Sequence, residues 1–428
     1  MKFNKWTLGL AAVGVVSLAS AARADEKMNS LQTALSNTTI SGSVSASFNW
    51  AITPGGSGNA VSPAGYIPFQ GQGYGEYGYY NNPTKQDGFN LDVVRLTIAK
   101  PEDESPWASG YQVDLMFGPD AVGYNPSANA KNYYGYEYGN GEDFAIKQAY
   151  VTLRTPVGNG IDWKIGVFDT IIGYEVTDAG SDPNYTRSWG YAVEPTEHTG
   201  VLASYTINPE WSVSAGVANT LGAGINSRDN ASNVAYGADN YWHKTLLGSV
   251  TFTAPSSWGW AAGSSGYFGV VYGFAPTTGY DSDYYGNYYY GGGNQFNLYA
   301  GATVNTPWKQ LTTGVAFDYA HNVGGGYHDE WFDVGVLGLY ATYKATDKLS
   351  FNARGEYVST TYYEGATYGS TASAIELTTT VEYDLWANVM TRLELRWDQD
   401  IDAKYFILND DLDHKGSVGL YANVIYKF

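Results

Sequence analysis

The chain ends in Gly416-Ser417-Val418-Gly419-Leu420-Tyr421-Ala422-Asn423-Val424-Ile425-Tyr426-Lys427-Phe428, the stretch that decides the fold. Successive side chains of a β-strand point to opposite faces, so alternate residues of this stretch share a face. One face is apolar and carries Val418, Leu420, Ala422, Val424, Tyr426 and Phe428. The other is mostly small or polar and carries Ser417, Gly419, Tyr421, Asn423, Ile425 and Lys427. Such a strand suits the wall of a transmembrane β-barrel, apolar toward lipid and polar toward enclosed water.

Segments with the same alternation recur along the whole chain. A tilted strand needs roughly 9–11 residues to cross a bilayer, and most of these segments reach that length. They lie at residues 38–50, 88–100, 108–118, 144–155, 160–169, 196–207, 211–220, 242–254, 264–274, 294–306, 309–320, 332–345, 348–360, 372–384, 389–398 and 416–428. The sequence therefore predicts an all-β fold, a transmembrane antiparallel β-barrel of the outer-membrane type with about 16 strands.

The connections between these segments alternate between short and long. The short ones are residues 156–159, 208–210, 307–308, 346–347 and 385–388, with two longer members at 101–107 and 255–263. The long ones are residues 51–87, 119–143, 170–195, 221–241, 275–293, 321–331, 361–371 and 399–415. Outer-membrane barrels have short periplasmic turns and long extracellular loops, so both termini of the mature chain are expected in the periplasm. A soluble β-sandwich gives no reason for this alternation.

The first residues have the features of a secretory signal. Lys2 and Lys5 precede an apolar stretch from residue 8 to residue 18, and Ala22-Arg23-Ala24 fits the small-x-small cleavage rule. A membrane-anchoring helix would need about 20 apolar residues, which this stretch does not reach. We therefore expect a signal peptide at residues 1–24, a short periplasmic segment at 25–37 and the barrel at 38–428.

Composition narrows the classes of function. Cleavage after residue 24 would change the net charge from −19 to −22, because residues 1–24 carry three basic and no acidic side chains. That sign disfavours nucleic acid as a partner. The chain has no cysteine and only five histidines, and none of these histidines stands beside a serine in a recognisable catalytic motif. We expect neither enzymatic activity nor a cofactor.

Charged residues recur on the polar face of several predicted strands. In residues 389–398, Arg392, Glu394 and Arg396 alternate with apolar residues, and such a row of charges is too costly to place in lipid. The corresponding faces of other segments carry Arg95, Asp114, Arg154, Lys164, Arg354, Glu356, Glu376 and Glu382. We interpret these side chains as lining the pore; the alternative is that they pair with one another and brace the wall. A negative wall and negative loops predict a weak preference for cations.

Residues 170–195 form the long connection after the fifth predicted strand. A barrel of sixteen strands encloses an aqueous channel, so we expect a folded-in loop to narrow it. Opposed acids and an arginine in this loop would also create a field across the pore. The constriction candidates are Glu175, Asp178, Asp182, Arg187 and Glu194. The alternative is an ordinary loop on the external surface.

Several motifs resemble those of the OmpL-like family of β-barrel porins. They are Gly88–Ile98 (Gly-Phe-Asn-Leu-Asp-Val-Val-Arg-Leu-Thr-Ile), Tyr111–Gly118, Ile146–Arg154, Trp163–Gly166, Gly173–Glu175, Asn184–Ser188 and His198–Gly200. The resemblance is dense over residues 88–220 and thins to a general barrel pattern afterwards. It implies an outer-membrane channel of a Gram-negative type of cell, and supports location and fold more firmly than substrate.

The expected function is passive diffusion of small hydrophilic solutes or cations through a loop-narrowed aqueous pore. Its partners would be outer-membrane lipid and, by analogy with other sixteen-strand porins, two further copies in a homotrimer. The alternative is a surface adhesion or structural protein with a plugged lumen. Its binding surfaces would be the Tyr-rich loops, with Tyr74, Tyr77, Tyr79, Tyr80, Tyr133, Tyr134, Tyr136, Tyr138, Tyr284, Tyr285 and Tyr288–Tyr290.

Two weaker signals concern metal ions. Acids at residues 398–413 could hold Ca²⁺, but they do not fit the twelve-residue calcium loop, and a solvated loop explains them better. His321, His328, Asp329 and Glu330 could bind a transition metal, although the two histidines are seven positions apart in a Gly-rich stretch. We therefore expect no metal site.

Overall fold

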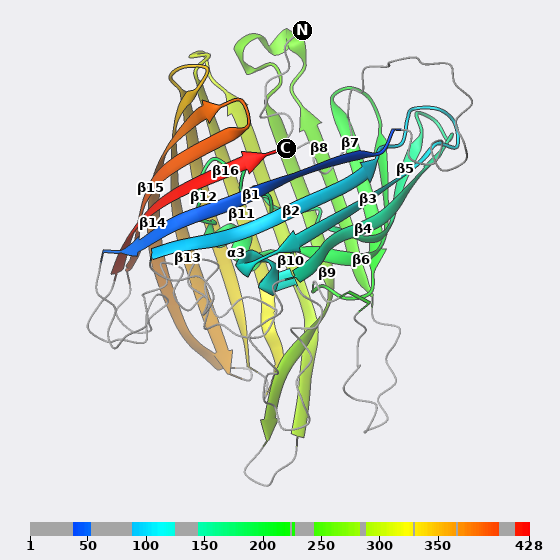
Figure 1. Cartoon of the computed structure of the whole chain (residues 1–428). Helices are drawn as coiled ribbons and strands as arrows, with labels where there is room; N and C mark the ends of the chain where they lie inside the picture. Colours follow the sequence, from blue (N-terminus) through cyan, green and yellow to red (C-terminus); the bar gives the residue numbers. More distant parts are fainter. Residues whose placement is uncertain are drawn as a thin grey trace.

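Sixteen strands form one closed antiparallel barrel, in which consecutive strands pair and β1 closes on β16 (Figure 1). The computed structural model describes residues 37–52, 88–124, 144–222, 225–226, 244–282, 288–327, 330–364, 367–401 and 416–428. The strands are β1 (Thr39–Ala51), β2 (Gly88–Lys100), β3 (Ser109–Phe117), β4 (Phe144–Thr155), β5 (Ile161–Asp169), β6 (Glu197–Thr206), β7 (Trp211–Ala218), β8 (Thr245–Thr253), β9 (Ser265–Ser282), β10 (Tyr288–Asn305), β11 (Leu311–Tyr327), β12 (Glu330–Lys344), β13 (Leu349–Glu364), β14 (Thr367–Trp386), β15 (Val389–Asp400) and β16 (Gly416–Lys427). Each overlaps one predicted segment, so the predicted sixteen-strand barrel is confirmed.

Three of the predicted long loops are shorter than expected. Most of residues 275–293 belongs to β9 and β10, which extend beyond the barrel rim as a long hairpin in Figure 1. Parts of residues 321–331 and 361–371 likewise continue the pairs β11–β12 and β13–β14. Gly-rich and Tyr-rich sequence favoured a loop, but antiparallel pairing with the neighbouring strand continues the backbone hydrogen-bond ladder there.

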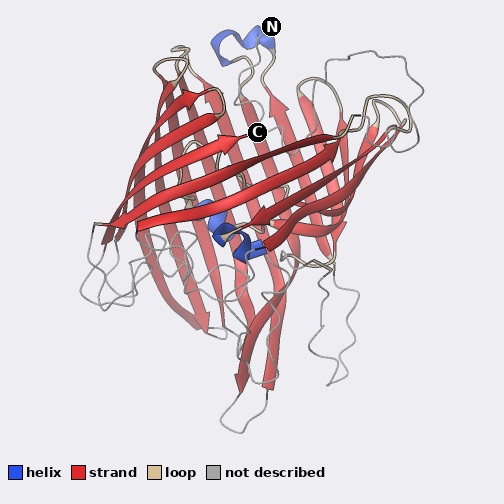
Figure 2. Cartoon of the chain, viewed as in Figure 1, coloured by secondary structure: helices blue, strands red, loops and turns tan. Residues whose placement is uncertain are grey.

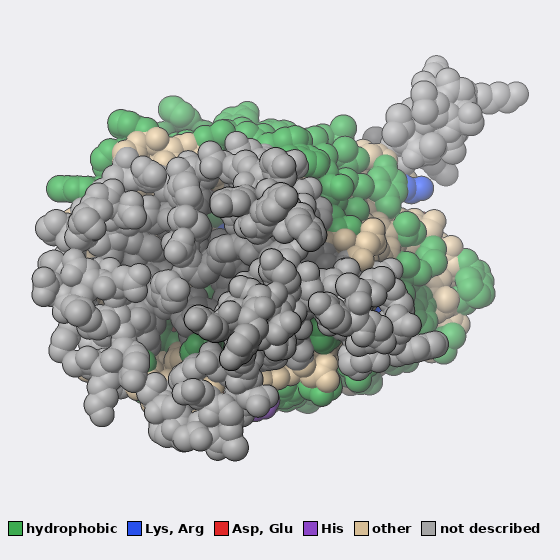
Figure 3. Space-filling view, turned by 90° about the horizontal axis from the view of Figure 1, so that it is seen from below, with side chains coloured by type: hydrophobic (Ala, Val, Ile, Leu, Met, Phe, Trp, Pro, Cys, Tyr) green, Lys and Arg blue, Asp and Glu red, His purple; other side chains and the backbone are tan. Residues whose placement is uncertain are grey.

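The strands bury alternate residues. On β16, Val424 and Tyr426 are 43% and 48% exposed on the outer face, whereas Asn423 and Ile425 are buried on the inner face. On β15, Leu393 and Leu395 are exposed outside while Arg392 and Glu394 are buried inside. Figure 3 views the molecule from the long-loop end and shows hydrophobic side chains around its outer rim. The apolar outer surface matches a barrel wall that faces lipid.

The barrel has one end with compact turns and one with long connections. The compact turns include the 3-10 helix η5 (Ser256–Ala261), which projects from the end opposite to the long β9–β10 hairpin (Figures 1 and 2). Exposed aromatic residues collect at this end, among them Trp107, Trp258, Trp308 and Trp386. Within the described residues, no helix is of the length and apolarity that a membrane-spanning helix needs.

The barrel interior contains helical turns and apolar clusters. The 3-10 helix η2 (Pro119–Tyr124) packs against β2, β3 and β4, and α3 (Trp189–Val193) packs against β11 and β12. Figure 2 shows these short helices within the outline of the barrel. One buried cluster joins Trp189 and Val193 to Val334, Val336 and Val358 on the inner wall. A stretch of the inner wall is therefore covered by protein.

Several sequence predictions concern residues outside the described ranges. These are the expected signal peptide and periplasmic segment up to residue 36, and the side chains of the Tyr-rich loops. The acids of residues 400–413, His328, Asp329 and the side chain of Glu330 also lie outside them. Among the residues that are described, no group of three metal-ligating side chains occurs, and His321 instead contacts Asp333 at 2.7 Å.

Candidate functional site: the inner loop and the wall of the lumen

The connection between β5 and β6, residues 170–196, lies inside the barrel, and we call it the inner loop. Near its start, the Ile171 carbonyl oxygen accepts a hydrogen bond from the Tyr267 hydroxyl on β9. Near its end, the Val193 carbonyl oxygen accepts one from Asn297 on β10, 2.9 Å away. Between them, the Tyr174 ring stacks on Tyr340 of β12 with centroids 4.1 Å apart. The loop thus leaves β5, runs over the inner faces of more distant strands and returns to β6.

Three buried arginines of the wall hold the backbone of the inner loop. Arg354 of β13 donates to the Thr186 carbonyl at 2.6 Å and to the Arg187 carbonyl at 3.1 Å. Arg396 of β15 donates to the same Arg187 carbonyl at 2.6 Å. Arg392 of β15 donates to the carbonyls of residues 179, 182 and 184 at 2.9–3.1 Å. A planar guanidinium carries five donors in fixed directions, so each arginine can serve several carbonyls at once.

Two wall carboxylates complement the arginines by accepting backbone N–H groups of the loop. Glu394 accepts from the amides of Tyr185 and Thr186 at 2.6 and 2.8 Å. Glu356 accepts from the amides of Trp189 and Gly190, at 2.7 and 3.2 Å, where α3 begins. Hydrogen bonds to ionised acceptors are among the stronger ones in proteins. The wall therefore binds both the carbonyl groups and the N–H groups of the loop backbone.

The charges around Arg354 form a buried network. Its guanidinium contacts Glu175 of the inner loop at 2.8 Å and Glu376 of β14 at 3.2 Å. Arg396 pairs with Asp398 at 2.8 Å and lies 3.9 Å from Glu376. Buried charges are tolerated only when they are paired and hydrogen-bonded, and this network meets that condition.

The tip of the inner loop reaches the last strand and, one strand beyond β1, also reaches β2. Lys427 of β16 donates to the Gly180 carbonyl at 2.6 Å, and Tyr185 donates to Asp92 of β2 at 2.9 Å. Burial by itself would raise the pKa of Asp178. The charges of Arg95 and Lys427 and hydrogen bonds from Ser181 and the Gly180 amide outweigh burial and lower it. Asp178 is thus an anion near the loop tip, and the charges of Arg95 and Lys427 stabilise it.

Two acids meet where the loop returns toward β6. Glu194 of the inner loop lies close to the buried Asp318 of β11. Burial raises the pKa of Glu194 well above its ordinary value, and the nearby acids raise it further. Gly190 is needed here, because a Cβ on it would lie 2.5 Å from the Asp318 carboxylate.

A second charged group lies on the wall formed by β2 to β6. Arg95 donates to Asp114 with its Nε at 3.0 Å, and Thr97 donates to the same carboxylate at 2.6 Å. Lys147 is buried between Asp169 and Glu197, with its Nζ 2.8 Å from Glu197. In this group Arg95 and Asp169 keep part of their surface exposed, with 14% and 39% of their side-chain areas accessible. This wall therefore retains charge at the edge of the lumen.

The structure separates the predicted pore residues into two groups. Glu175, Asp182, Arg187, Arg354, Glu356, Glu376, Arg392, Glu394 and Arg396 are buried where the loop meets the wall. Six of them bind the loop backbone or lie beneath it and are at most 4% exposed: Arg354, Glu356, Glu376, Arg392, Glu394 and Arg396. That these side chains line the pore stays a prediction. These side chains are buried because a loop that is distant in sequence covers them. The alternation of residues along a strand does not reveal such a contact.

Most of the other predicted residues keep contact with more open space, and Asp114 is the exception. Asp178 and Glu382 are partly exposed, and Lys164 lies over the Tyr150 ring at 5.0 Å. Arg154 pairs with Asp162 at 2.6 Å close to the turn at residues 156–160, so it belongs to the rim of the barrel. Asp114 is fully buried under Arg95. The role of these residues in a constriction stays a prediction.

Sequence reasoning missed several residues of the site. Asp92 accepts hydrogen bonds from Ser45, Ser47 and Tyr185, at 2.7–2.9 Å, and lies at an irregularity in the β1–β2 pairing. Trp189 belongs to the inner loop and donates its amide to Glu356, and Asp318 lies close to Glu194 of this loop. One signal was available for the apolar part of the wall. On β12, Val334 and Val336 alternate with Leu337 and Leu339, and strands that are apolar on both faces are typically buried on both.

Comparisons with known proteins agree with this architecture. Residues 33–428 match the family described as "Putative beta-barrel porin-2, OmpL-like". No protein of curated function matches the sequence.

Solved structures with the same fold include three outer-membrane proteins. OmpT of Vibrio cholerae, in a structure described as its trimer form, has a TM-score of 0.56 at 12% identity, covering 91% of this chain and 99% of that one. The outer-membrane channel DcaP of Acinetobacter baumannii has a TM-score of 0.54 at 12% identity, with 91% and 97% covered. An anion-selective porin from Comamonas acidovorans has a TM-score of 0.51 at 11% identity, with 91% and 99% covered. The chain is thus an outer-membrane β-barrel that belongs to the OmpL-like family of β-barrel porins.

Proposed function

We propose that the protein is a passive channel for small hydrophilic solutes, without an enzymatic step. The observation that carries this proposal is the position of the inner loop. The start of the loop packs with Ile171 and Ile172 into a buried cluster with Leu202, Leu247 and Tyr267, and the rest of it binds β13 to β16 and, at its tip, β2. The inner faces of β3, β5, β6 and β7 also carry polar side chains that are partly exposed. Examples are Gln112, Lys164, Ser204 and Ser214. A loop fixed to one wall would narrow a sixteen-strand lumen and leave an aqueous path along the other.

Charge at the edge of this path supports a weak preference for cations. Asp178 on the loop is a partly exposed anion and Arg95 on β2 is a partly exposed cation, so charges of opposite sign would border the path. The chain as a whole carries a net charge of −19, which lowers the electrostatic energy of cations near the mouths. We propose size exclusion at the loop together with this electrostatic bias as the basis of selectivity. By analogy with the trimer form of Vibrio cholerae OmpT, we also propose a homotrimer.

A second function has one observation in its favour. Residues 182–191 of the inner loop are all buried, which is also what a plug would require. A structural or adhesive outer-membrane protein with a closed lumen is therefore the alternative.

Planar bilayers separate the two functions. We expect the purified protein to insert with stepwise conductance, and a variant in which residues 177–190 are replaced by a short Gly-Ser linker to conduct more per step. Heat-modifiable migration on gels would show that both proteins are folded. Silence of a folded wild-type barrel would reject the channel, and equal conductance of the two proteins would reject narrowing by the loop.

A further inference from the structure

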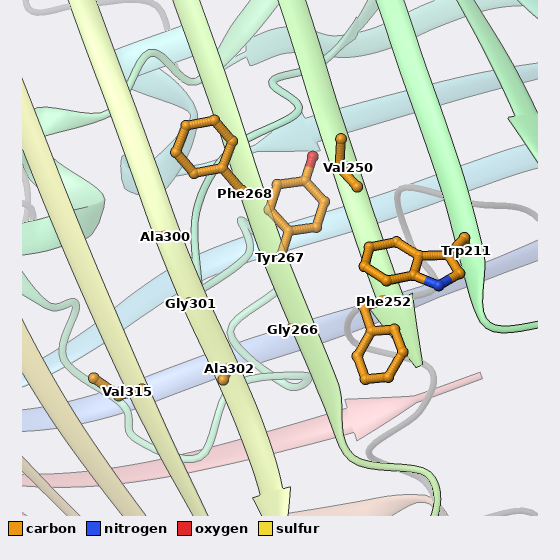
Figure 4. A pocket seen from close by; sticks show the side chains of 10 residues that line it. All are labelled: Trp211, Val250, Phe252, Gly266, Tyr267, Phe268, Ala300, Gly301, Ala302 and Val315. Carbon is orange, nitrogen blue, oxygen red and sulfur yellow. The ribbon is translucent and has the colours of Figure 1, made fainter. Parts of the chain in front are cut away.

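A groove runs along the outer surface of the barrel over β7 to β11 (Figure 4). Its volume is about 410 Å³, and its lining is almost entirely apolar. Its floor consists of the small residues Gly266, Ala300 and Ala302, and Phe268 and Trp211 are among the large side chains beside it. A Cβ built on Gly266 meets no atom within 4 Å, so the floor is open.

The groove lies on the membrane side of the wall. Phe268 on β9 and Val250 on β8 are 47% and 37% exposed. Tyr267, the residue before Phe268, points to the opposite face and donates a hydrogen bond to the inner loop. In an outer-membrane barrel this surface meets hydrocarbon. A depression there must be filled by lipid or by another protein, because leaving it empty would forfeit dispersion contacts along its whole lining.

The groove is close to the short-turn end of the barrel, on the periplasmic side. Trp211 is the first residue of β7, Phe252 is the last but one of β8, and Gly266 is the second of β9. It therefore faces the leaflet on the side of the compact turns. An occupant from the membrane would be a phospholipid of the periplasmic leaflet.

An aromatic cluster closes the periplasmic end of the groove. The Trp211 and Phe252 rings have centroids 4.8 Å apart, and Phe252 is 5.4 Å from Trp258 of η5. Trp258 and Trp260 remain 55% and 57% exposed. Indole rings favour the headgroup level of a bilayer, so these positions mark the boundary between acyl chain and headgroup.

A lysine lies at the same, periplasmic end of the barrel as the aromatic cluster. The turn after β10 carries the exposed Lys309, and η5 is fixed to the end of β10 by a hydrogen bond from Asn305 to the Ala262 carbonyl, 2.8 Å long. An ammonium group near the headgroup level can neutralise a phosphate. The order of these features matches the order of the parts of a phospholipid. The apolar groove corresponds to the acyl chain, the aromatic cluster to the glycerol region and Lys309 to the headgroup.

We propose that this groove binds one acyl chain of a periplasmic-leaflet phospholipid, with the headgroup near Trp258 and Lys309. A flexible chain can fill a depression of this shape without a matching surface, whereas a second copy of the protein would need a complementary ridge. The site is independent of the channel function, because it lies on the outside of the wall.

Native mass spectrometry of the full barrel tests the proposal with phosphatidylglycerol or phosphatidylethanolamine as the probe. We expect the wild type to retain one phospholipid after detergent exchange, and Gly266→Trp to reduce that retention at least tenfold. Gly335→Trp is the matched control, since Gly335 also faces outward on β12 and a Cβ on it meets no atom within 4 Å. Equal retention by all three proteins would overturn the site. A change of oligomeric mass in Gly266→Trp alone would overturn it in favour of an interface between copies.

Photo-crosslinking gives a readout that does not depend on a folded variant. A phospholipid with a photoreactive acyl chain, reconstituted with the wild type, should label peptides of β8 to β10 more than the outward faces of β13 and β14. Uniform labelling would contradict a specific groove. For the headgroup, Lys309→Gln should lower the preference for phosphatidylglycerol over phosphatidylethanolamine. Lys348→Gln, in another compact turn, should leave that preference unchanged.

Discussion

At the scale of single residues, the arginines of the inner wall act as anchors for the inner loop. Arg354 shows this most fully, because its guanidinium serves two loop carbonyls and also compensates Glu175 and Glu376. A buried arginine that only lined a pore would lack these partners. The contribution of Arg354 to the stability of the barrel therefore depends on its contacts with the inner loop.

Replacing Arg354 should release the loop. Arg354→Ala leaves buried carboxylates without compensation, and breaking such a network costs about 3–5 kcal/mol. We expect a larger conductance per step and a lower temperature for the heat-modifiable gel transition. Arg154→Ala is the matched control, because Arg154 pairs with Asp162 at the partly exposed rim, where an ion pair contributes less than about 1 kcal/mol. The anchor role is contradicted if both variants behave alike.

The pair of Glu194 and Asp318 should make loop docking depend on pH. The pKa of Glu194 is raised in the folded barrel. The contribution of Glu194 to the stability of loop docking is therefore complete below the ordinary glutamate pKa, and it is lost as pH rises through the raised value. Conductance should therefore become noisier or larger toward alkaline pH. Glu194→Gln keeps a hydrogen-bond donor at all pH values and should flatten this dependence. The idea fails if wild type and variant share one pH profile.

At the scale of elements, the inner loop is an ordered part of the barrel with defined hydrogen bonds. The amides of Tyr185 and Thr186 bind Glu394, and those of Trp189 and Gly190 bind Glu356. These four N–H groups should exchange slowly with solvent, in contrast to ordinary surface loops.

Hydrogen exchange can assign each pair of amides to its carboxylate. A hydrogen bond to a charged group contributes about 1.5–3 kcal/mol, so losing it should speed local exchange by about 10- to 100-fold. We expect Glu356→Gln to expose residues 189–190 while 185–186 stay protected, and Glu394→Gln to do the reverse. Each variant is the control for the other, and simultaneous exposure of both pairs would argue that the loop detaches as one unit.

At the scale of the whole molecule, net charge and the open side of the lumen should set selectivity. In a potassium chloride gradient we expect a reversal potential of the cation-selective sign. Asp178→Asn should reduce it, because Asp178 is a partly exposed anion of the inner loop. Asp347→Asn is the matched control, since Asp347 is fully exposed in a compact turn. A reversal potential of zero or of the opposite sign would reject the proposed preference.

The sequence by itself determined the barrel, its strand positions and its outer-membrane location. Alternation with a period of two is a local property, so β16 could be assigned from its own residues, and turn lengths fixed which end faces the periplasm. The extensions of β9 and β10 were missed because their Gly-rich and Tyr-rich residues gain order from pairing with each other. Only the tertiary structure decided what the inward charges do. Arg354 and Glu175 are 179 residues apart, and neither their contact nor the burial of the wall beneath the loop is encoded in any local pattern.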